Sequence, residues 1–219
     1  MRPLCPHCQR PTCACLCAWA TPTSNRLPVL VLQHPLEASQ AKGTVRLLRL
    51  SLAQCQLEVG LQFNPSALAG WLGAPGSSLL LYPDSPGAPP AQPDGQPEAP
   101  APGHASALPR PQRLVLLDGT WRQARGLLRA NPLLQTLPRW ALPAPAPSRY
   151  AIRQAHHPAQ RSTLEAACAA LALLEDRPSH YAPLLQAFSA WVANLAAQAA
   201  AGRVGSVARS SVARPAAGS

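Results

Sequence analysis

The stretch that decides the fold is RLVLLDGTWRQARGLLRA, residues 113–130. Its segment 114–117 is a continuous apolar run of the length expected for a strand buried on both faces. The run stops at Asp118, which is followed by Gly119. Ligands of open α/β sheets bind at the carboxyl ends of the strands, so Asp118 is a candidate site residue. The alternative is that this Asp-Gly pair is only a turn.

A helix is expected directly after this break. Apolar residues recur there at helical spacing, and Thr120 and Gln123 stand at the first and fourth positions of a capping box. This pattern predicts a helix that begins at Trp121. The order strand, polar break, helix is the unit from which α/β sheets are built.

Two more apolar runs, at 26–33 and 78–82, have the length of buried strands. Each of them also ends in polar or turn-forming residues, namely Gln33, His34, Tyr82 and Pro83. The ends of parallel strands meet at one edge of a sheet, so we expect these residues to lie near Asp118. Three roles remain open for His34: a catalytic base, an RNA contact or a structural residue.

The remaining pattern completes an α/β fold with a mostly parallel sheet. A weaker alternating strand is expected at 57–63 and a loop at 137–140. Helices are expected at 43–53, 162–175 and 179–201. A second capping box, Ser162 with Glu165, predicts where the middle one begins.

The first 20 residues hold five of the seven cysteines. Cys5-x2-Cys8 followed by Cys15-x-Cys17 supplies four thiolates in a short loop, enough for a closed structural zinc site. Cys13 or His7 is an alternative ligand, and a redox-active or fortuitous cluster is the alternative interpretation. We favour zinc because the segment has too few apolar residues to fold without a cross-link.

The domain organisation follows from composition. We expect a zinc knuckle at 1–20, an α/β domain at 21–201 and a flexible tail at 202–219. Ten prolines occur from Pro83 to Pro111, both ends counted. Residues of about 84–111 are therefore expected to be a disordered insertion within the domain.

The net charge of +10 comes from 19 basic and 9 acidic residues, with a single lysine. Guanidinium groups suit contacts with phosphates and bases, so we expect RNA binding. Candidate contacts are Arg46, Arg49, Arg149 and Arg153. The alternative is that a GC-rich coding sequence enriches arginine, alanine and proline together.

Neither a signal peptide nor an apolar run of roughly 18 residues stands out in the sequence. We therefore expect a cytoplasmic protein without a membrane partner. In a reducing compartment, closely spaced cysteines more often hold a metal than form disulfides.

Six segments together resemble the DTW-domain family, the tRNA-uridine aminocarboxypropyltransferases. They occur in the family's order over most of residues 5–175, and D-x-T-W at 118–121 is the family signature. The segments are the cysteine knuckle, LQHPLE, LLLYP, LLDGTW, YAIR and STLEA. The family's relation to the SPOUT class implies an α/β fold with a C-terminal knot that binds S-adenosylmethionine.

The resemblance implies transfer of the 3-amino-3-carboxypropyl group of S-adenosylmethionine to N3 of a tRNA uridine, with release of methylthioadenosine. The catalytic residues implied are Asp118, Thr120 and Trp121, with Asp118 as the base that removes the N3 proton. Trp121 is interpreted either as a stacking platform or as a core residue. The cofactor contacts implied are Gln33, His34, Tyr82, Pro83, Arg122, Ser162, Thr163 and Glu165.

Several alternatives stay open at the level of sequence. The partner of the methionine carboxylate is either the start of the helix at Trp121 or one of three arginines, Arg46, Arg122 and Arg153. A SPOUT-type RNA methyltransferase would use the same cofactor but transfer a different carbon. A non-enzymatic, zinc-stapled RNA-binding module would need no cofactor pocket.

Overall fold

The computed structural model describes residues 3–38, 40, 43–82, 111–142 and 162–210. Its centre is a five-stranded sheet in the order β2-β1-β4-β3-β5, and every neighbouring pair is parallel. The strands are β1 Val29–Gln33, β2 Cys55–Val59, β3 Ser78–Leu81, β4 Arg113–Asp118 and β5 Arg139–Trp140. The predicted parallel α/β sheet is therefore confirmed.

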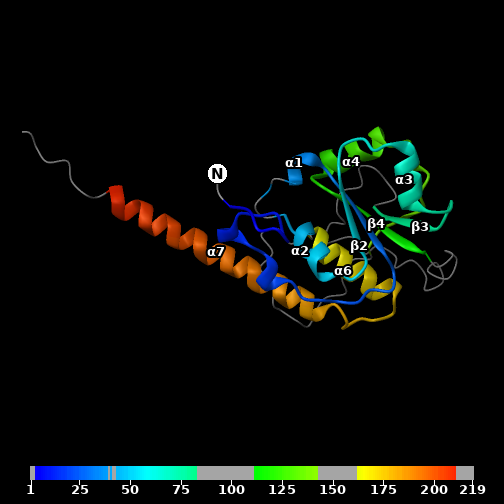
Figure 1. The fold of residues 1–219 in the computed structure, drawn as a ribbon. Helices are drawn as coiled ribbons and strands as arrows, with labels where there is room; N and C mark the ends of the chain where they lie inside the picture. Colours follow the sequence, from blue (N-terminus) through cyan, green and yellow to red (C-terminus); the bar gives the residue numbers. More distant parts are fainter. Residues whose placement is uncertain (1–2, 39, 41–42, 83–110, 143–161, 211–219) are drawn as a thin grey trace, which may run out of the picture.

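Helices cover both faces of this sheet (Figure 1). The helices α3, α4 and α5 pack on one face, and α2, α6 and α7 pack on the other. Their bounds are α1 Pro35–Ala38, α2 Val45–Ser51, α3 Pro65–Leu72, α4 Trp121–Ala130, α5 Pro132–Gln135, α6 Thr163–Leu174 and α7 Ala182–Ser210. Two 3-10 turns, η1 Thr12–Ala14 and η2 Cys17–Trp19, belong to the cysteine-rich segment.

The apolar runs of the sequence are buried because the sheet has a core on each side. Every residue of β1 is buried: Val29 and Val31 face the core of α2, α6 and α7, whereas Leu30 and Leu32 face that of α3 and α4. A strand packed on both faces has no polar side to alternate with, which explains its continuous apolar sequence.

The strand expected at 57–63 was placed too far along the chain. β2 ends at Val59, and α3 begins at Pro65. Asn64 caps this helix, since its side chain accepts hydrogen bonds from two backbone N–H groups of the first turn. An N-cap followed by proline is a helix-start signal that the alternating pattern concealed.

The loop expected at 137–140 is partly a strand. β5 pairs with β3, with Arg139 opposite Leu80 and Trp140 opposite Leu81. A two-residue strand has no periodicity to detect, and its pairing depends on contacts with residues about 60 positions earlier in the chain.

The last helix is longer than expected. It ends at Ser210 and not at Ala201, so the tail expected to be flexible begins as helix. Two glycines, Gly202 and Gly205, do not interrupt it, since each costs only about 1 kcal/mol relative to alanine. α7 extends away from the sheet in Figure 1.

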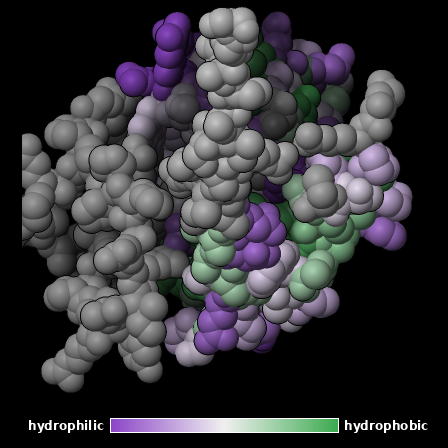
Figure 2. Space-filling model, turned by 90° about the vertical axis from the view of Figure 1, so that its left-hand side faces the viewer, coloured by the Kyte–Doolittle hydropathy of each residue, from purple (hydrophilic) through white to green (hydrophobic). Residues whose placement is uncertain are grey.

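Figure 2 looks onto the side from which α7 extends, where hydrophilic and apolar residues are intermixed. Among the described residues, no helix has both the length and the apolar character required to cross a membrane.

Several expectations concern residues outside those described. The proline-rich insertion falls there, except for Pro111, as do Pro83, Arg149 and Arg153. The expected C-terminal knot is not tested by the described residues.

Candidate active site and metal centre

Asp118 lies at the carboxyl end of the central strand β4 and is only 8% exposed. Its carboxylate accepts two hydrogen bonds from different elements. Gln33 Nε2 donates to Oδ2 at 2.7 Å, and Thr163 Oγ1 donates to Oδ1 at 2.5 Å. The end of β1, the end of β4 and the start of α6 therefore meet at one carboxylate.

The parallel register brings Gln33 to Asp118. The two residues are direct partners in the β1–β4 pairing, and His34 N–H donates to the Asp118 carbonyl at 3.0 Å. Strands that run in the same direction end at the same edge, as expected from the polar residues after each apolar run.

The predicted capping box at the start of α4 is confirmed. Thr120 N–H donates to Gln123 Oε1 at 2.6 Å, and Gln123 N–H donates to Thr120 Oγ1 at 3.3 Å. The cap folds closely over Gly119, where a Cβ atom would lie 2.9 Å from Gln123 Cβ. The glycine thus permits the turn that joins Asp118 to the helix.

The second capping box, at the start of α6, is also confirmed. Glu165 Oε2 accepts from Ser162 N–H and from Ser162 Oγ, each at 3.0 Å. Ser162 and Glu165 are therefore engaged in holding the helix start. Their effect is to present the neighbouring Thr163 to Asp118.

Trp121 is not a core residue, because 55% of it is exposed. Its ring meets the buried ring of Tyr82 edge to face, with a centroid distance of 5.8 Å and an interplanar angle of 73°. Trp121 is the first residue of α4 and follows Asp118 by three positions in the chain, and its exposed indole is available to stack on a planar ligand. The end of β4 and the start of α4 thus supply a carboxylate and an aromatic surface.

Gln33 has an unusual amide. The residue is 2% exposed, and its Oε1 has no hydrogen-bond partner within the described part of the structure. Buried acceptors are normally satisfied, so this oxygen is suited to accept from a ligand donor at the sheet edge. His34 is half-buried, and its Nδ1 accepts from Leu36 N–H at 3.2 Å.

The four cysteines of the predicted knuckle converge. Their sulfur atoms lie within 4.8 Å of one another, with Cys5 to Cys17 and Cys8 to Cys15 each at 3.7 Å. Four sulfurs bound to tetrahedral Zn²⁺ would stand about 3.8 Å apart, since each Zn–S bond is about 2.3 Å. The donor set and its spacing therefore fit a zinc ion. His7 is exposed and is not a member of this group.

The surroundings of this cluster suit its charge. Backbone N–H groups of Cys8 and His7 lower the pKa of Cys5 to about 6, whereas a hydrogen bond with Cys15 and burial raise the pKa of Cys17 to about 12. Arg46 donates from Nη1 to the carbonyls of Cys8 and Gln9, at 2.9 and 3.0 Å. The guanidinium therefore lies next to the cysteine loop, where its charge would offset part of the negative charge of a metal–thiolate group.

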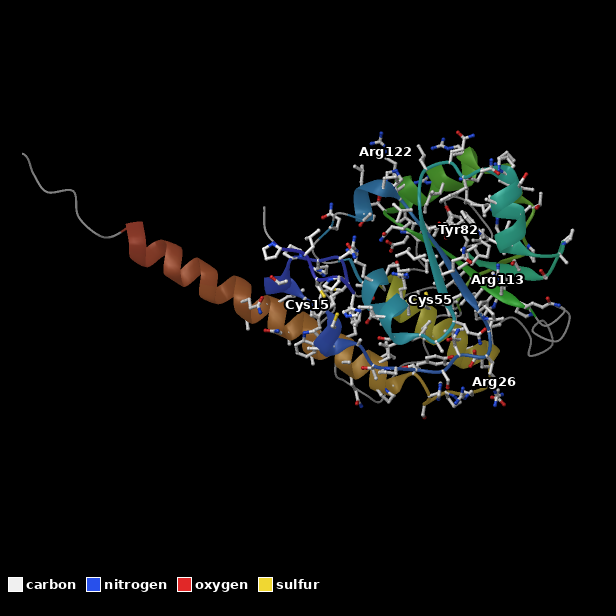
Figure 3. All side chains as sticks on the ribbon, in the orientation of Figure 1. Cys15, Arg26, Cys55, Tyr82, Arg113 and Arg122 are labelled. Carbon is white, nitrogen blue, oxygen red and sulfur yellow. The ribbon has the colours of Figure 1, made fainter. Side chains whose placement is uncertain are left out.

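Two other cysteines, Cys55 and Cys168, lie apart from this group. Burial raises the pKa of each to about 12, so both are thiols at neutral pH and not nucleophiles. Figure 3 shows the knuckle residue Cys15 near α7, well separated from Tyr82 and Arg122 at the sheet edge.

The expected RNA contacts differ in their availability. Arg46 is committed to the knuckle by its bonds to Cys8 and Gln9 and by a third, from Nη2 to the Ala38 carbonyl at 3.1 Å. Arg49 is exposed on α2. Arg122 is exposed in the first turn of α4, directly after Trp121 in the chain.

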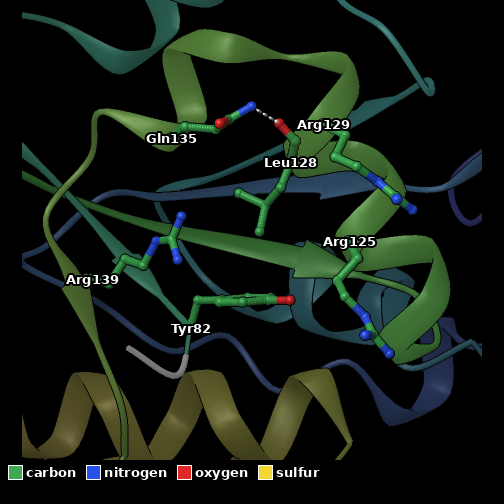
Figure 4. A pocket seen from close by; sticks show the side chains of 6 residues that line it. All are labelled: Tyr82, Arg125, Leu128, Arg129, Gln135 and Arg139. Carbon is green, nitrogen blue, oxygen red and sulfur yellow. Dashed lines mark hydrogen bonds between the residues drawn. The ribbon is translucent and has the colours of Figure 1, made fainter. Parts of the chain in front are cut away.

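A cavity of about 260 Å³ opens beside Tyr82 and was not predicted from the sequence (Figure 4). Its walls come from α4, α5, β5 and the residue that follows β3. They are Tyr82, Arg125, Leu128, Arg129, Gln135 and Arg139. The i, i+4 spacing of Arg125 and Arg129 on α4 was visible in the sequence. The third arginine of the wall, Arg139, lies in β5, a segment that was expected to be a loop.

Comparison with known proteins gives one family. The DTW domain matches residues 2–196 of the chain. A Drosophila melanogaster protein named tRNA-uridine aminocarboxypropyltransferase 2 is 34% identical over 182 residues, which cover 80% of this chain and 67% of that protein. Proteins of the same name from Macaca fascicularis and Mus musculus are 30% and 29% identical over 190 residues, covering 80% of this chain.

The chain spans 57% of the length of the macaque and mouse relatives, and about two thirds of the fly relative. No solved structure matches it.

Proposed function

This chain belongs to the DTW-domain family, and we propose that it transfers the 3-amino-3-carboxypropyl group of S-adenosylmethionine to N3 of a tRNA uridine. The proposal is supported by the names of its relatives, which are tRNA-uridine aminocarboxypropyltransferases. The observation that carries it is the buried Asp118 carboxylate, which two donors hold at the edge of a parallel sheet.

The reaction joins uracil N3 to the methionine Cγ and breaks the bond between Cγ and the sulfonium sulfur. The electron pair of that bond remains on sulfur, which leaves as the neutral thioether methylthioadenosine. S-adenosylmethionine supplies an activated leaving group, so the protein must orient Cγ and remove the N3 proton.

Asp118 is suited to take that proton. Both of its carboxyl oxygens accept a hydrogen bond, one from the Gln33 amide and one from the Thr163 hydroxyl. A carboxylate with two fixed donors keeps further lone pairs for a third partner. Gln33 and Thr163 are positioning residues in this account, because they orient Asp118 without contacting the reacting atoms.

Trp121 is proposed to stack on the target uracil. Its exposed ring belongs to the first residue of the helix that follows Asp118, and it packs edge to face with the ring of Tyr82. Stacking would fix the plane of the base and thereby the direction of its N3–H bond.

The cofactor is proposed to bind at the same carboxyl edge, in a SPOUT-like arrangement with a C-terminal knot. The unsatisfied Oε1 of Gln33 supports this, since an amino group of the cofactor would satisfy it. The N-terminus of α4 at Trp121 and Arg122 is the proposed partner of the methionine carboxylate.

Zinc is proposed to have a structural role. Cys5, Cys8, Cys15 and Cys17 would hold it and leave no open position for a substrate. Its contribution would be folding free energy for a segment with little apolar content.

The proposal is tested by incubating the protein with S-adenosylmethionine and bulk tRNA and identifying both products by mass spectrometry. Methylthioadenosine together with a uridine heavier by the aminocarboxypropyl group is expected. S-adenosylhomocysteine with a methylated nucleoside would replace the proposal by a methyltransferase. Absence of any cofactor-derived product, with tRNA binding intact, would favour a non-enzymatic RNA-binding module.

A further inference from the structure

The cavity beside Tyr82 has six lining residues, of which three are arginines and none is acidic. We propose that it binds a backbone phosphodiester of the tRNA strand that carries the target uridine. This inference rests on the proposed function for the identity of the RNA, but it rests on the cavity alone for the chemistry of the ligand.

The three arginines that line the cavity come from two elements. Arg125 and Arg129 are one turn apart on α4 and therefore project from the same side of the helix. Arg139 belongs to β5 and forms the opposite wall, with Leu128 pointing from α4 toward Tyr82 between them (Figure 4). The lining offers no carboxylate to pair with these arginines, which leaves the cavity suited to an anionic ligand.

The arginine of β5 is held in place by an aromatic ring. Its guanidinium carbon lies 5.7 Å from the centroid of Tyr82, a cation–π contact. Tyr82 in turn meets Trp121 edge to face. A continuous path of side chains thus leads from Arg139 through Tyr82 and Trp121 to the neighbourhood of Asp118.

The side chains along this path follow the order of the parts of a nucleotide, with the aromatic ring at the base and the arginines at the backbone. A base stacked on Trp121 would reach Asp118, and the adjoining backbone would run along α4 over Arg125 and Arg129. Both arginines are exposed, and the helix carries no acidic residue. Aromatic stacking combined with a cationic track is the usual way in which proteins bind single-stranded RNA.

A phosphodiester fits better than the methionine carboxylate, the other anion of the reaction. Small-molecule sites typically occupy about 300–1,000 Å³, so a cavity of about 260 Å³ suits a phosphate with part of its sugar better than a whole cofactor. Three forked guanidinium groups also match the several oxygens of a nucleotide backbone and exceed what one carboxylate can satisfy.

The test uses the full chain and three variants. Arg139→Gln and the double variant Arg125→Gln/Arg129→Gln remove cavity charge, and Arg139→Lys keeps the charge but loses the fork. Arg26→Gln is the matched control, because Arg26 is exposed and lies at the far side of the fold from Tyr82 (Figure 3). For each protein, tRNA affinity is measured by fluorescence anisotropy at several salt concentrations, and S-adenosylmethionine affinity by calorimetry.

The proposal predicts that Arg139→Gln lowers tRNA affinity on the order of 10-fold, the loss expected for one charge-assisted hydrogen bond. The slope of log affinity against log salt should fall by about 1 for each phosphate contact removed. Arg139→Lys should recover part of the affinity. S-adenosylmethionine affinity and melting temperature should remain those of the unaltered protein.

Two results would overturn the inference. A loss of S-adenosylmethionine affinity with unchanged tRNA affinity would make the cavity the carboxylate site. A loss of tRNA affinity no larger than that of Arg26→Gln would show only general electrostatics. Because both readouts are binding measurements, they stand even if the protein forms no aminocarboxypropyl product, so failure of the proposed function would be seen separately.

Discussion

Thr163 Oγ1 donates to Asp118 Oδ1 at 2.5 Å, which joins the first residue of α6 to the last residue of β4. The two residues are 45 positions apart in the chain. The bond makes the start of one helix part of the site formed at the end of a strand. It also explains why a capping box is placed at Ser162, directly before Thr163.

The role of this bond is tested by Thr163→Val, which keeps the shape of the side chain and removes the hydroxyl. Transfer activity should fall about 10-fold, because one charge-assisted hydrogen bond to Asp118 is lost. Thr163→Ser retains the hydroxyl and should restore most of the activity. Equal activity of the Val and Ser variants would mean that the bond does not orient Asp118.

Trp121 is expected to contribute to binding and not to stability, since it is 55% exposed. Trp121→Ala should weaken tRNA binding by about 5-fold to 100-fold, the range for one stacked base. The melting temperature should hardly change. The comparison is Trp191→Ala in the core, where the residue is 3% exposed and the expected cost is about 3–5 kcal/mol. A Trp121→Ala protein that binds tRNA normally would refute stacking.

The zinc proposal predicts that Cys5→Ser and Cys17→Ser lose metal and melt at lower temperature. Cys55→Ser is the control, because Cys55 lies outside the cluster and should leave the metal content unchanged. Metal is measured by elemental analysis of protein purified under reducing conditions. S-adenosylmethionine affinity should be retained in all three variants, since the knuckle and the sheet edge are separate (Figure 3). Protein without zinc that is nevertheless folded would contradict the proposal.

Glu175 is expected to act only on stability. Its side chain is 3% exposed and accepts from the N–H groups of Arg26 and Leu27, at 2.8 and 2.9 Å, and from the Tyr181 hydroxyl at 2.9 Å. Glu175→Ala leaves these donors unsatisfied and should lower the free energy of unfolding on the order of 3 kcal/mol. Denaturation measurements check this, with Glu58→Ala on the edge strand expected to cost less. Normal stability of Glu175→Ala would show that water replaces the carboxylate.

The local patterns of the sequence predicted the parts of the fold that depend on local interactions. The boxes at Thr120 and Ser162 located the starts of α4 and α6, because a cap is formed by neighbours in the chain. The apolar runs located the buried strands, and their parallel direction placed Gln33 beside Asp118. Side-chain contacts between distant segments, away from this shared edge of the sheet, were not predictable in this way.

Arg46 and Arg139 illustrate that limit. Arg46 was expected to contact RNA, yet its guanidinium donates to backbone carbonyls of the cysteine knuckle, which lies almost 40 residues earlier. Arg139 was expected in a loop, yet edge pairing with β3 turns it toward Tyr82. In both cases the role of an arginine depends on which distant element lies beside it, and charge and periodicity contain no such information.

The most direct test of the account is transfer activity of Asp118→Asn. The substitution preserves size, and its neighbours can adapt, because the Gln33 amide can turn and the Thr163 hydroxyl can either donate or accept. The protein should therefore fold and bind S-adenosylmethionine. Transfer to tRNA should drop by about 10²–10⁴-fold, the contribution of a general base, and raising the pH should restore part of it by ionising uridine N3. Activity near that of the unaltered protein, with the same pH dependence, would contradict the assignment of Asp118 as the base.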